Sequence, residues 1–191
     1  MERTLPSTNA THDRLVRMAG WIETPIRWIG ALCGVCTLAV VLLTCVLVVA
    51  RYGFDYGSIA SQELVLHLNA ASFLFGGAYA LLSDAHVRVD ILQQRWSPRT
   101  QRRAELIGLL LLLLPFCVVL FWTSLDYVAA SWSLREASRE ADGLPGLYLV
   151  KSLIPAAAAL LAFAGLARAL RMLAGESPTA ASAVSHQGGG A

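Results

Sequence analysis

Charged side chains are scarce in this sequence of 191 residues: Asp, Glu, Lys and Arg make up 15% of it, and Lys151 is its single lysine. Hydrophobic side chains make up 56%, and the mean hydropathy is +0.57. So little polar surface cannot cover a water-soluble globule of this size. The net charge of +2 is also too small to indicate binding to nucleic acid. The composition therefore predicts a protein whose apolar side chains meet lipid.

The cysteines provide no framework of disulfides between loops. All four lie inside apolar stretches, at Cys33, Cys36, Cys45 and Cys117. Cys33 and Cys36 form a C-x-x-C motif, but no β–α–β pattern surrounds it and no second Cys or His pair completes a zinc site. We predict that these thiols pack as small hydrophobic groups, with redox or metal chemistry as the alternative.

The common catalytic motifs are missing as well. The sequence has no P-loop, nucleophile elbow, H-E-x-x-H or dinucleotide-binding fingerprint, so we predict neither an enzymatic role nor a cofactor. A four-helix drug exporter would need an acidic residue inside the first apolar stretch, which has none. A membrane-anchor or cytochrome-type subunit of a respiratory complex stays open as the alternative function. It would need two facing haem ligands, and His67 is the only histidine well inside an apolar stretch.

What the sequence does contain is four long apolar stretches, at about residues 29–50, 64–82, 106–125 and 147–170. At about 1.5 Å per residue, each is long enough to cross a hydrocarbon core of about 30 Å as a helix. We therefore predict an all-α integral membrane protein with a four-helix membrane domain at residues 28–173. Residues 1–27 precede it, with a short surface helix at Arg14–Ile22, and residues 174–191 form a disordered tail.

The basic residues predict the orientation of the spans. Eleven of the fifteen basic residues would lie on one side of the membrane, and the other four are Arg51, Arg135, Arg139 and Lys151. Because basic residues concentrate on the cytoplasmic side, both termini are predicted to be cytoplasmic.

The loop between the second and third spans predicts a short interfacial helix on that cytoplasmic side. Val89, Leu92 and Trp96 fall on one face, while Arg88 and Arg95 can reach lipid headgroups. Arg88, Asp90 and Arg95 are therefore predicted to anchor the loop. Ser97 followed by Pro98 predicts the start of the next helix, which Pro115 is predicted to kink.

Two features of the second span predict contacts with protein rather than lipid. Ser72, Gly76 and Ala80 recur every four residues, a ridge of small side chains that lets another helix approach closely. Glu63 and His67 stand one turn apart and could pair or contact a partner. In the fourth span, Ala156–Ala159 offer a second close-packing surface.

Two groups of short motifs resemble one transporter family. The first comprises Glu63-Leu64, Phe73 to Ala80 and His86-Val87-Arg88-Val89-Asp90. The second comprises Ser131-Trp132, Glu136, Ser138, Gly143-Leu144-Pro145, Lys151-Ser152 and Ile154-Pro155. From about Trp28 to Leu173, their order and spacing resemble the small, DctQ-type permease subunit of tripartite ATP-independent periplasmic (TRAP) transporters. The combination with His67 resembles the subgroup for mannitol, chloroaromatic compounds and 2-oxo acids.

This resemblance implies a bacterial inner-membrane transporter of three parts. A periplasmic binding protein captures the solute, a large permease subunit binds it together with sodium, and the small subunit serves as a scaffold. It implies that Glu136, Arg139, Gly143 and Pro145 lie where the binding protein docks. The solute itself is not indicated, because the resemblance places recognition on the other two components.

Overall fold

A computed structural model describes residues 8–83 and 97–175 of the chain. Its order of elements is α1 (Thr8–Phe54), α2 (Ile59–Leu82), α4 (Pro98–Gly108), the π-helical η1 (Leu109–Leu113), α5 (Leu114–Ser133) and α6 (Leu147–Ala174). The described residues contain no β-strand, and four helical runs in them are long and apolar enough to cross a membrane. The prediction of an all-helical chain with four candidate spans is therefore confirmed. The predicted interfacial helix with Arg88, Asp90 and Arg95, and the tail from residue 176 onward, lie outside the described residues.

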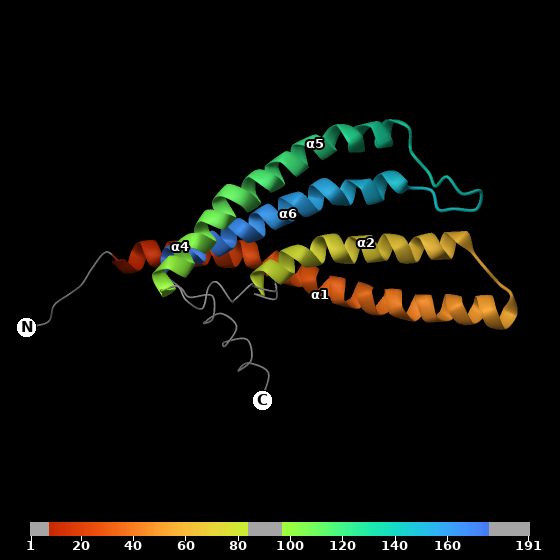
Figure 1. Cartoon of the computed structure of the whole chain (residues 1–191), viewed down its shortest axis with the longest axis horizontal. Helices are drawn as coiled ribbons and strands as arrows, with labels where there is room; N and C mark the ends of the chain where they lie inside the picture. The colour runs from red at the N-terminus through yellow and green to blue at the C-terminus, as the bar shows by residue number, and fades with distance from the viewer. Residues whose placement is uncertain (1–7, 84–96, 176–191) are drawn as a thin grey trace, which may run out of the picture.

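The helices form a bundle with two distinct ends (Figure 1). One end, here called the terminal end, carries the first turns of α1, the start of α4 and the last turns of α6. The other end, the hairpin end, carries the α1–α2 turn and the loop between α5 and α6. Helices α1 and α2 lie side by side, as do α5 and α6, and α6 also contacts both α1 and α2. Helix α6 is therefore the central helix of the bundle.

Small side chains allow α6 to occupy this central position. Its buried residues are mostly small: Pro155, Ala157, Ala158, Ala164, Gly165, Ala167 and Ala169, together with Arg168 and Met172. Ala164 packs with Ile26 of α1 and Ala78 of α2, and Ala169 and Met172 pack with Leu109 of η1. Since lipid offers helices no hydrophobic reason to associate, close approach through small residues is the main source of their packing energy. The predicted surface at Ala156–Ala159 is part of this contact, with Ala157 and Ala158 buried and Ala156 exposed.

Helix α1 is longer than the sequence predicts. The predicted surface helix at Arg14–Ile22 is continuous with the first span, because α1 runs through Pro25 without a break. Proline lacks the N–H that would bond the carbonyl of Trp21. Burial of Ala19, Glu23 and Ile26 on the neighbouring turns offsets that loss and keeps this part of α1 helical.

The start of α2 and the run from α4 to α5 show how side chains cap and distort helices. Ser58 caps α2 by accepting a hydrogen bond from the Ser61 N–H at 3.3 Å, so α2 begins five residues before the predicted span. Ser97 caps α4 in the same way through Thr100, as predicted. The predicted kink at Pro115 takes the form of the π-helical turn η1 just before it, because Pro115 cannot donate to Leu111.

Candidate functional site

The loop at the hairpin end, residues 134–146, has a defined shape. Arg135 has a positive φ of 44° and Gly146 one of 106°, so the chain turns sharply at both ends of the loop. Between them Ala137 and Pro145 pair as an isolated β-bridge, and the Ser138 N–H donates to the Leu144 carbonyl at 3.2 Å. The loop therefore forms a small hairpin rather than an open connection.

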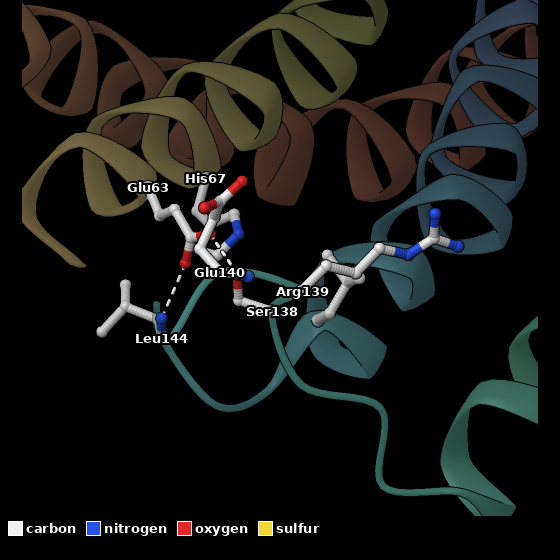
Figure 2. A pocket seen from close by; sticks show the side chains of 7 residues that line it. Glu63, His67, Ser138, Arg139, Glu140 and Leu144 are labelled. Atoms are coloured by element: carbon white, nitrogen blue, oxygen red, sulfur yellow. Dashed lines mark hydrogen bonds between the residues drawn. The ribbon is translucent and has the colours of Figure 1, made fainter. Parts of the chain in front are cut away.

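Glu63 at the start of α2 binds this hairpin with both carboxylate oxygens (Figure 2). The Ser138 hydroxyl donates to Oε1, and the Leu144 N–H donates to Oε2 at 2.6 Å. The sequence predicted that Glu63 pairs with His67 or contacts a partner, whereas its described hydrogen bonds run to the loop. Because α2 and the loop belong to different halves of the chain, Glu63 links the α1–α2 pair to the α5–α6 pair.

Gly143 lies directly beneath this link. A Cβ atom at Gly143 would lie 2.2 Å from Ser138 Oγ and 2.9 Å from Glu63 Oε1, closer than any ordinary contact. Glycine at this position is therefore required for Glu63 to reach the loop. Gly143, which was predicted to lie where the binding protein docks, therefore has a role in shaping the loop.

A cavity of about 240 Å³ lies between α2 and the loop (Figure 2). Its lining residues are Glu63, His67, Ser138, Arg139, Glu140, Leu144 and Leu147. Both signs of charge face it, and Arg139 and Glu140 are exposed to solvent. Of the predicted docking residues, Arg139 lines the cavity, and Pro145 pairs with Ala137 in the β-bridge.

Glu136, the remaining docking residue, points to α6. Its carboxylate accepts hydrogen bonds from Lys151 Nζ and, at 2.7 Å, from the Ser131 hydroxyl. These bonds, with Lys151 first, hold the pKa of Glu136 below its ordinary value. Lys151 also lies over the Tyr127 ring at 4.2 Å from its centroid. Lys151 therefore joins α5, α6 and the loop.

Trp132 adds an aromatic contact beside this ion pair. Its indole N–H donates to the Ser152 hydroxyl at 2.8 Å, and its ring meets Tyr148 edge to face at a centroid distance of 4.6 Å. The motifs Ser131-Trp132 and Lys151-Ser152 of the sequence therefore form one cluster where α5 ends and α6 begins.

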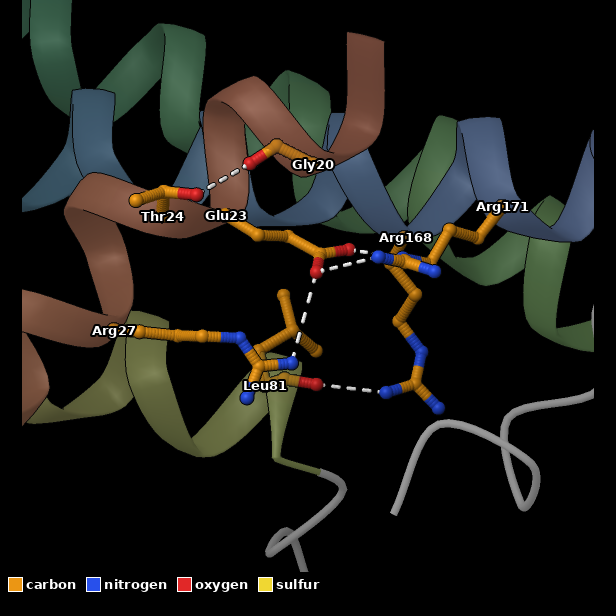
Figure 3. Close-up of polar contacts among 7 residues, drawn as sticks. All are labelled: Gly20, Glu23, Thr24, Arg27, Leu81, Arg168 and Arg171. Carbon is orange, nitrogen blue, oxygen red and sulfur yellow. Dashed lines mark hydrogen bonds and ion pairs between the residues drawn. The ribbon is translucent and has the colours of Figure 1, made fainter. Parts of the chain in front are cut away.

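A second polar cluster lies at the terminal end, and sequence reasoning missed it (Figure 3). Glu23 of α1 is only 5% exposed; it forms a two-point ion pair with Arg171 of α6 and lies 3.6 Å from Arg27. Buried Arg168 donates to Glu105 of α4 at 2.7 Å and to the Leu81 carbonyl at the end of α2 at 2.7 Å. The cluster therefore ties α1, α2, α4 and α6 together. The available signal was a carboxylate before the first span and another before the third, with two arginines three residues apart near the end of the fourth.

The ridge of small residues on α2 is used only in part within the chain. Ser72 is buried, and its hydroxyl donates to the Leu68 carbonyl at 2.9 Å. A Cβ atom at Gly76 would meet nothing within 4 Å, and Ala80 is half-buried. The close approach of α1 to α2 is made elsewhere, where a Cβ at Gly30 would lie 2.3 Å from the Tyr79 ring.

Comparison with known protein families identifies the chain. The family described as "Tripartite ATP-independent periplasmic transporters, DctQ component" matches residues 40–175, more than half of the sequence. The chain belongs to this DctQ family. Members are small subunits of TRAP transporters, which work with a large permease and a periplasmic binding protein, so the family is one of transporter components and not of enzymes. No curated protein matches the sequence.

Proposed function

We propose that this DctQ subunit is a scaffold for the large permease subunit of a sodium-driven TRAP transporter. A periplasmic binding protein would deliver the solute, and the resemblance of the motifs to the mannitol, chloroaromatic and 2-oxo acid subgroup favours an organic acid. One observation supports a scaffold most strongly: in the described residues, charged groups lie outside the four apolar stretches or near their ends, and several pair within the chain. A solute pathway needs polar groups deep in the bundle, and sodium coupling is therefore assigned to the large subunit.

The orientation that we propose is an inner-membrane protein with both termini in the cytoplasm. The arginines support it, since eleven of the fifteen basic residues belong to segments on the side of the termini. The hairpin end would then face the periplasm. Arg88, Asp90 and Arg95 would anchor the cytoplasmic loop to lipid headgroups.

For the binding protein we propose docking on the loop at the hairpin end. Arg139 and Pro145 would make the contact, since both are exposed on the hairpin. Glu136 and Gly143 would keep the loop in shape through Lys151 and Glu63. Glu63 and His67 of α2, which line the cavity under the loop, would hold the loop in position for the binding protein.

For the large subunit we propose contact at the ridge Ser72, Gly76 and Ala80. The space beside Gly76 supports this, because a helix can approach there as closely as the glycine allows.

Co-purification tests this proposal. The tagged chain is expressed with the large permease subunit of the same transporter, and we expect the two to purify together in mild detergent. Gly76→Leu should lower recovery of the large subunit about tenfold or more, because leucine removes the close approach. Gly34→Leu is the matched control, since a Cβ at Gly34 also meets nothing within 4 Å. Failure of the unmodified pair to co-purify would refute the scaffold, whereas equal recovery with both variants would refute only the ridge.

A further inference from the structure

The first part of α1 has an apolar stripe that nothing in the described chain covers. Met18, Trp21 and Trp28 are 56%, 80% and 75% exposed, and at 100° per residue they fall on one face of the helix. The opposite face carries Ala19, Glu23 and Ile26, which are buried against the rest of the bundle. Below Trp28 the stripe continues through the exposed residues Leu32 and Val35 of the first span.

This stripe is too long for the hydrocarbon core of a bilayer. From Met18 to Ala50 the helix extends about 50 Å at 1.5 Å per residue. A tilt of about 40°, the upper end of the usual range, still leaves a span of about 38 Å against a core of about 30 Å. Met18 and Trp21 therefore lie at the depth of the headgroups, where bulk acyl chains do not reach them.

Two arginines stand where the stripe ends. Arg14 and Arg17 line an open hollow of about 490 Å³ together with Met18, Trp21 and Ile22. The surface of the hollow is apolar, so the arginines contribute their aliphatic stems and their guanidinium groups extend beyond it. Guanidinium groups bind phosphate through paired N–H donors, and Trp favours the interface between headgroup and chain.

We propose that this part of α1 binds one anionic phospholipid. The headgroup phosphate is held by Arg14 and Arg17, and an acyl chain lies over Met18, Trp21 and Trp28. The charge of the arginines selects an anionic lipid over a zwitterionic one. The acyl chain of the bound lipid covers the apolar side chains that lie beyond the hydrocarbon core of the bilayer. The proposal needs α1 to cross a membrane with this face open to lipid, so it is independent of which solute the transporter carries.

Fluorescence quenching by brominated lipids tests the proposal. Trp21 is kept as the sole tryptophan, with Trp28, Trp96, Trp122 and Trp132 replaced by Phe. The chain is reconstituted in phosphatidylcholine vesicles containing brominated phosphatidylglycerol or, separately, brominated phosphatidylcholine. We expect Trp21 to be quenched at lower mole fractions of the phosphatidylglycerol. Arg14→Gln with Arg17→Gln should reduce this preference about tenfold.

Arg102→Gln with Arg103→Gln is the matched control, since it removes the same charge from exposed positions on α4 at the same end. The control should keep the preference. An equal loss in both double variants would overturn the proposal, because general attraction to an anionic surface would then explain the binding. Equal quenching by the two lipids, or loss of the preference when millimolar inorganic phosphate is added, would also overturn it.

Native mass spectrometry of the purified chain provides a second measurement. Phosphatidylglycerol should remain bound to the unmodified chain and to the α4 control, and Trp21→Ala should retain less of it. If Trp21 in the complex with the large subunit is quenched by neither lipid, a protein surface covers the stripe and the proposal is wrong.

Discussion

The two ends of the bundle are held together by different means. At the terminal end, Glu23 and Arg168 are buried and join helices directly, α1 to α6 and α6 to α4 and α2. At the hairpin end, Glu63 of α2 binds the intervening loop, and Glu136 of that loop binds Ser131 of α5 and Lys151 of α6, so the helices are joined through the loop. The first arrangement fixes distances between helices, whereas the second fixes the shape of a loop.

This difference matches the proposed division of labour. A scaffold needs helices that keep their positions, and buried ion pairs are costly to break because they would leave a charge without its partner. A docking surface needs a loop that is shaped but still exposed to its partner.

Neutralising Glu23 should have the largest effect. Glu23→Gln removes the charge of the buried carboxylate that Arg171 and Arg27 share, although both arginines keep some access to solvent, and we expect the free energy of unfolding to fall by about 1–3 kcal/mol. Asp142→Asn, an exposed change at the hairpin end, is the control and should stay within about 0.5 kcal/mol. Denaturation of both variants in the same detergent provides the measurement. Equal, small effects would show that the terminal end is not held by its ion pairs.

Adding a methyl group at Gly143 should break the hairpin end. Because the Cβ would overlap Ser138 and Glu63, Gly143→Ala should cost about 1–3 kcal/mol and free the loop. Hydrogen exchange should rise at Ser138 and Leu144 but not in α1 or α6. Gly57→Ala, which meets nothing within 4 Å in the turn between α1 and α2, should leave exchange unchanged. Faster exchange throughout the bundle would contradict the local role of the link.

The Glu136–Lys151 pair predicts how the loop responds to pH. Since the pKa of Glu136 is lowered in the folded chain, its contribution is complete above its unfolded pKa of about 4.3 and is lost as the pH falls through the lower folded value. Fluorescence of Trp132, kept as the sole tryptophan, should thus be constant from pH 8 to about 5 and change only at a pH below the unfolded pKa of the Glu136 carboxyl. Glu136→Gln should remove that change. A transition of the unmodified chain near neutral pH would contradict this account.

Removing one hydrogen bond of Trp132 should have the smallest effect. Trp132→Phe loses the hydrogen bond to Ser152 but keeps a ring beside Tyr148. We therefore expect the free energy of unfolding, measured by thermal unfolding, to fall by about 0.5–1 kcal/mol. Trp122→Phe, at a side chain 72% exposed on α5, should change nothing. If Trp122→Phe lowered the free energy of unfolding more than Trp132→Phe does, the packing of α5 described here would be wrong.

The sequence predicts the four candidate spans because long uncharged stretches have one stable form in lipid, the helix. Local signals also predict the cap at Ser97 and the distortion before Pro115, since both depend on neighbouring residues. The sequence predicts the first turns of α1 and α2 less well, since both helices begin before the predicted spans. Their first turns are stabilised by a contact with α6 and by the Ser58 cap, neither of which hydrophobicity reports.

The candidate site is less predictable for a physical reason. Glu63 is separated from Leu144 by 81 positions, and Glu23 from Arg171 by 148, so only the packed bundle brings these partners together. The motifs include Glu63, Glu136 and Gly143, which the structure places in the contacts that shape the loop. They could not distinguish a residue that contacts a partner from one that shapes the loop, because both need the same side chain at the same place.

Sodium-driven flux in proteoliposomes tests the scaffold most directly. This chain alone, the large subunit alone, and both together are reconstituted with the periplasmic binding protein and a labelled organic acid outside the vesicles. An inward sodium gradient should drive uptake when both membrane subunits are present and none when this chain is alone. Uptake by this chain without the large subunit would contradict the account.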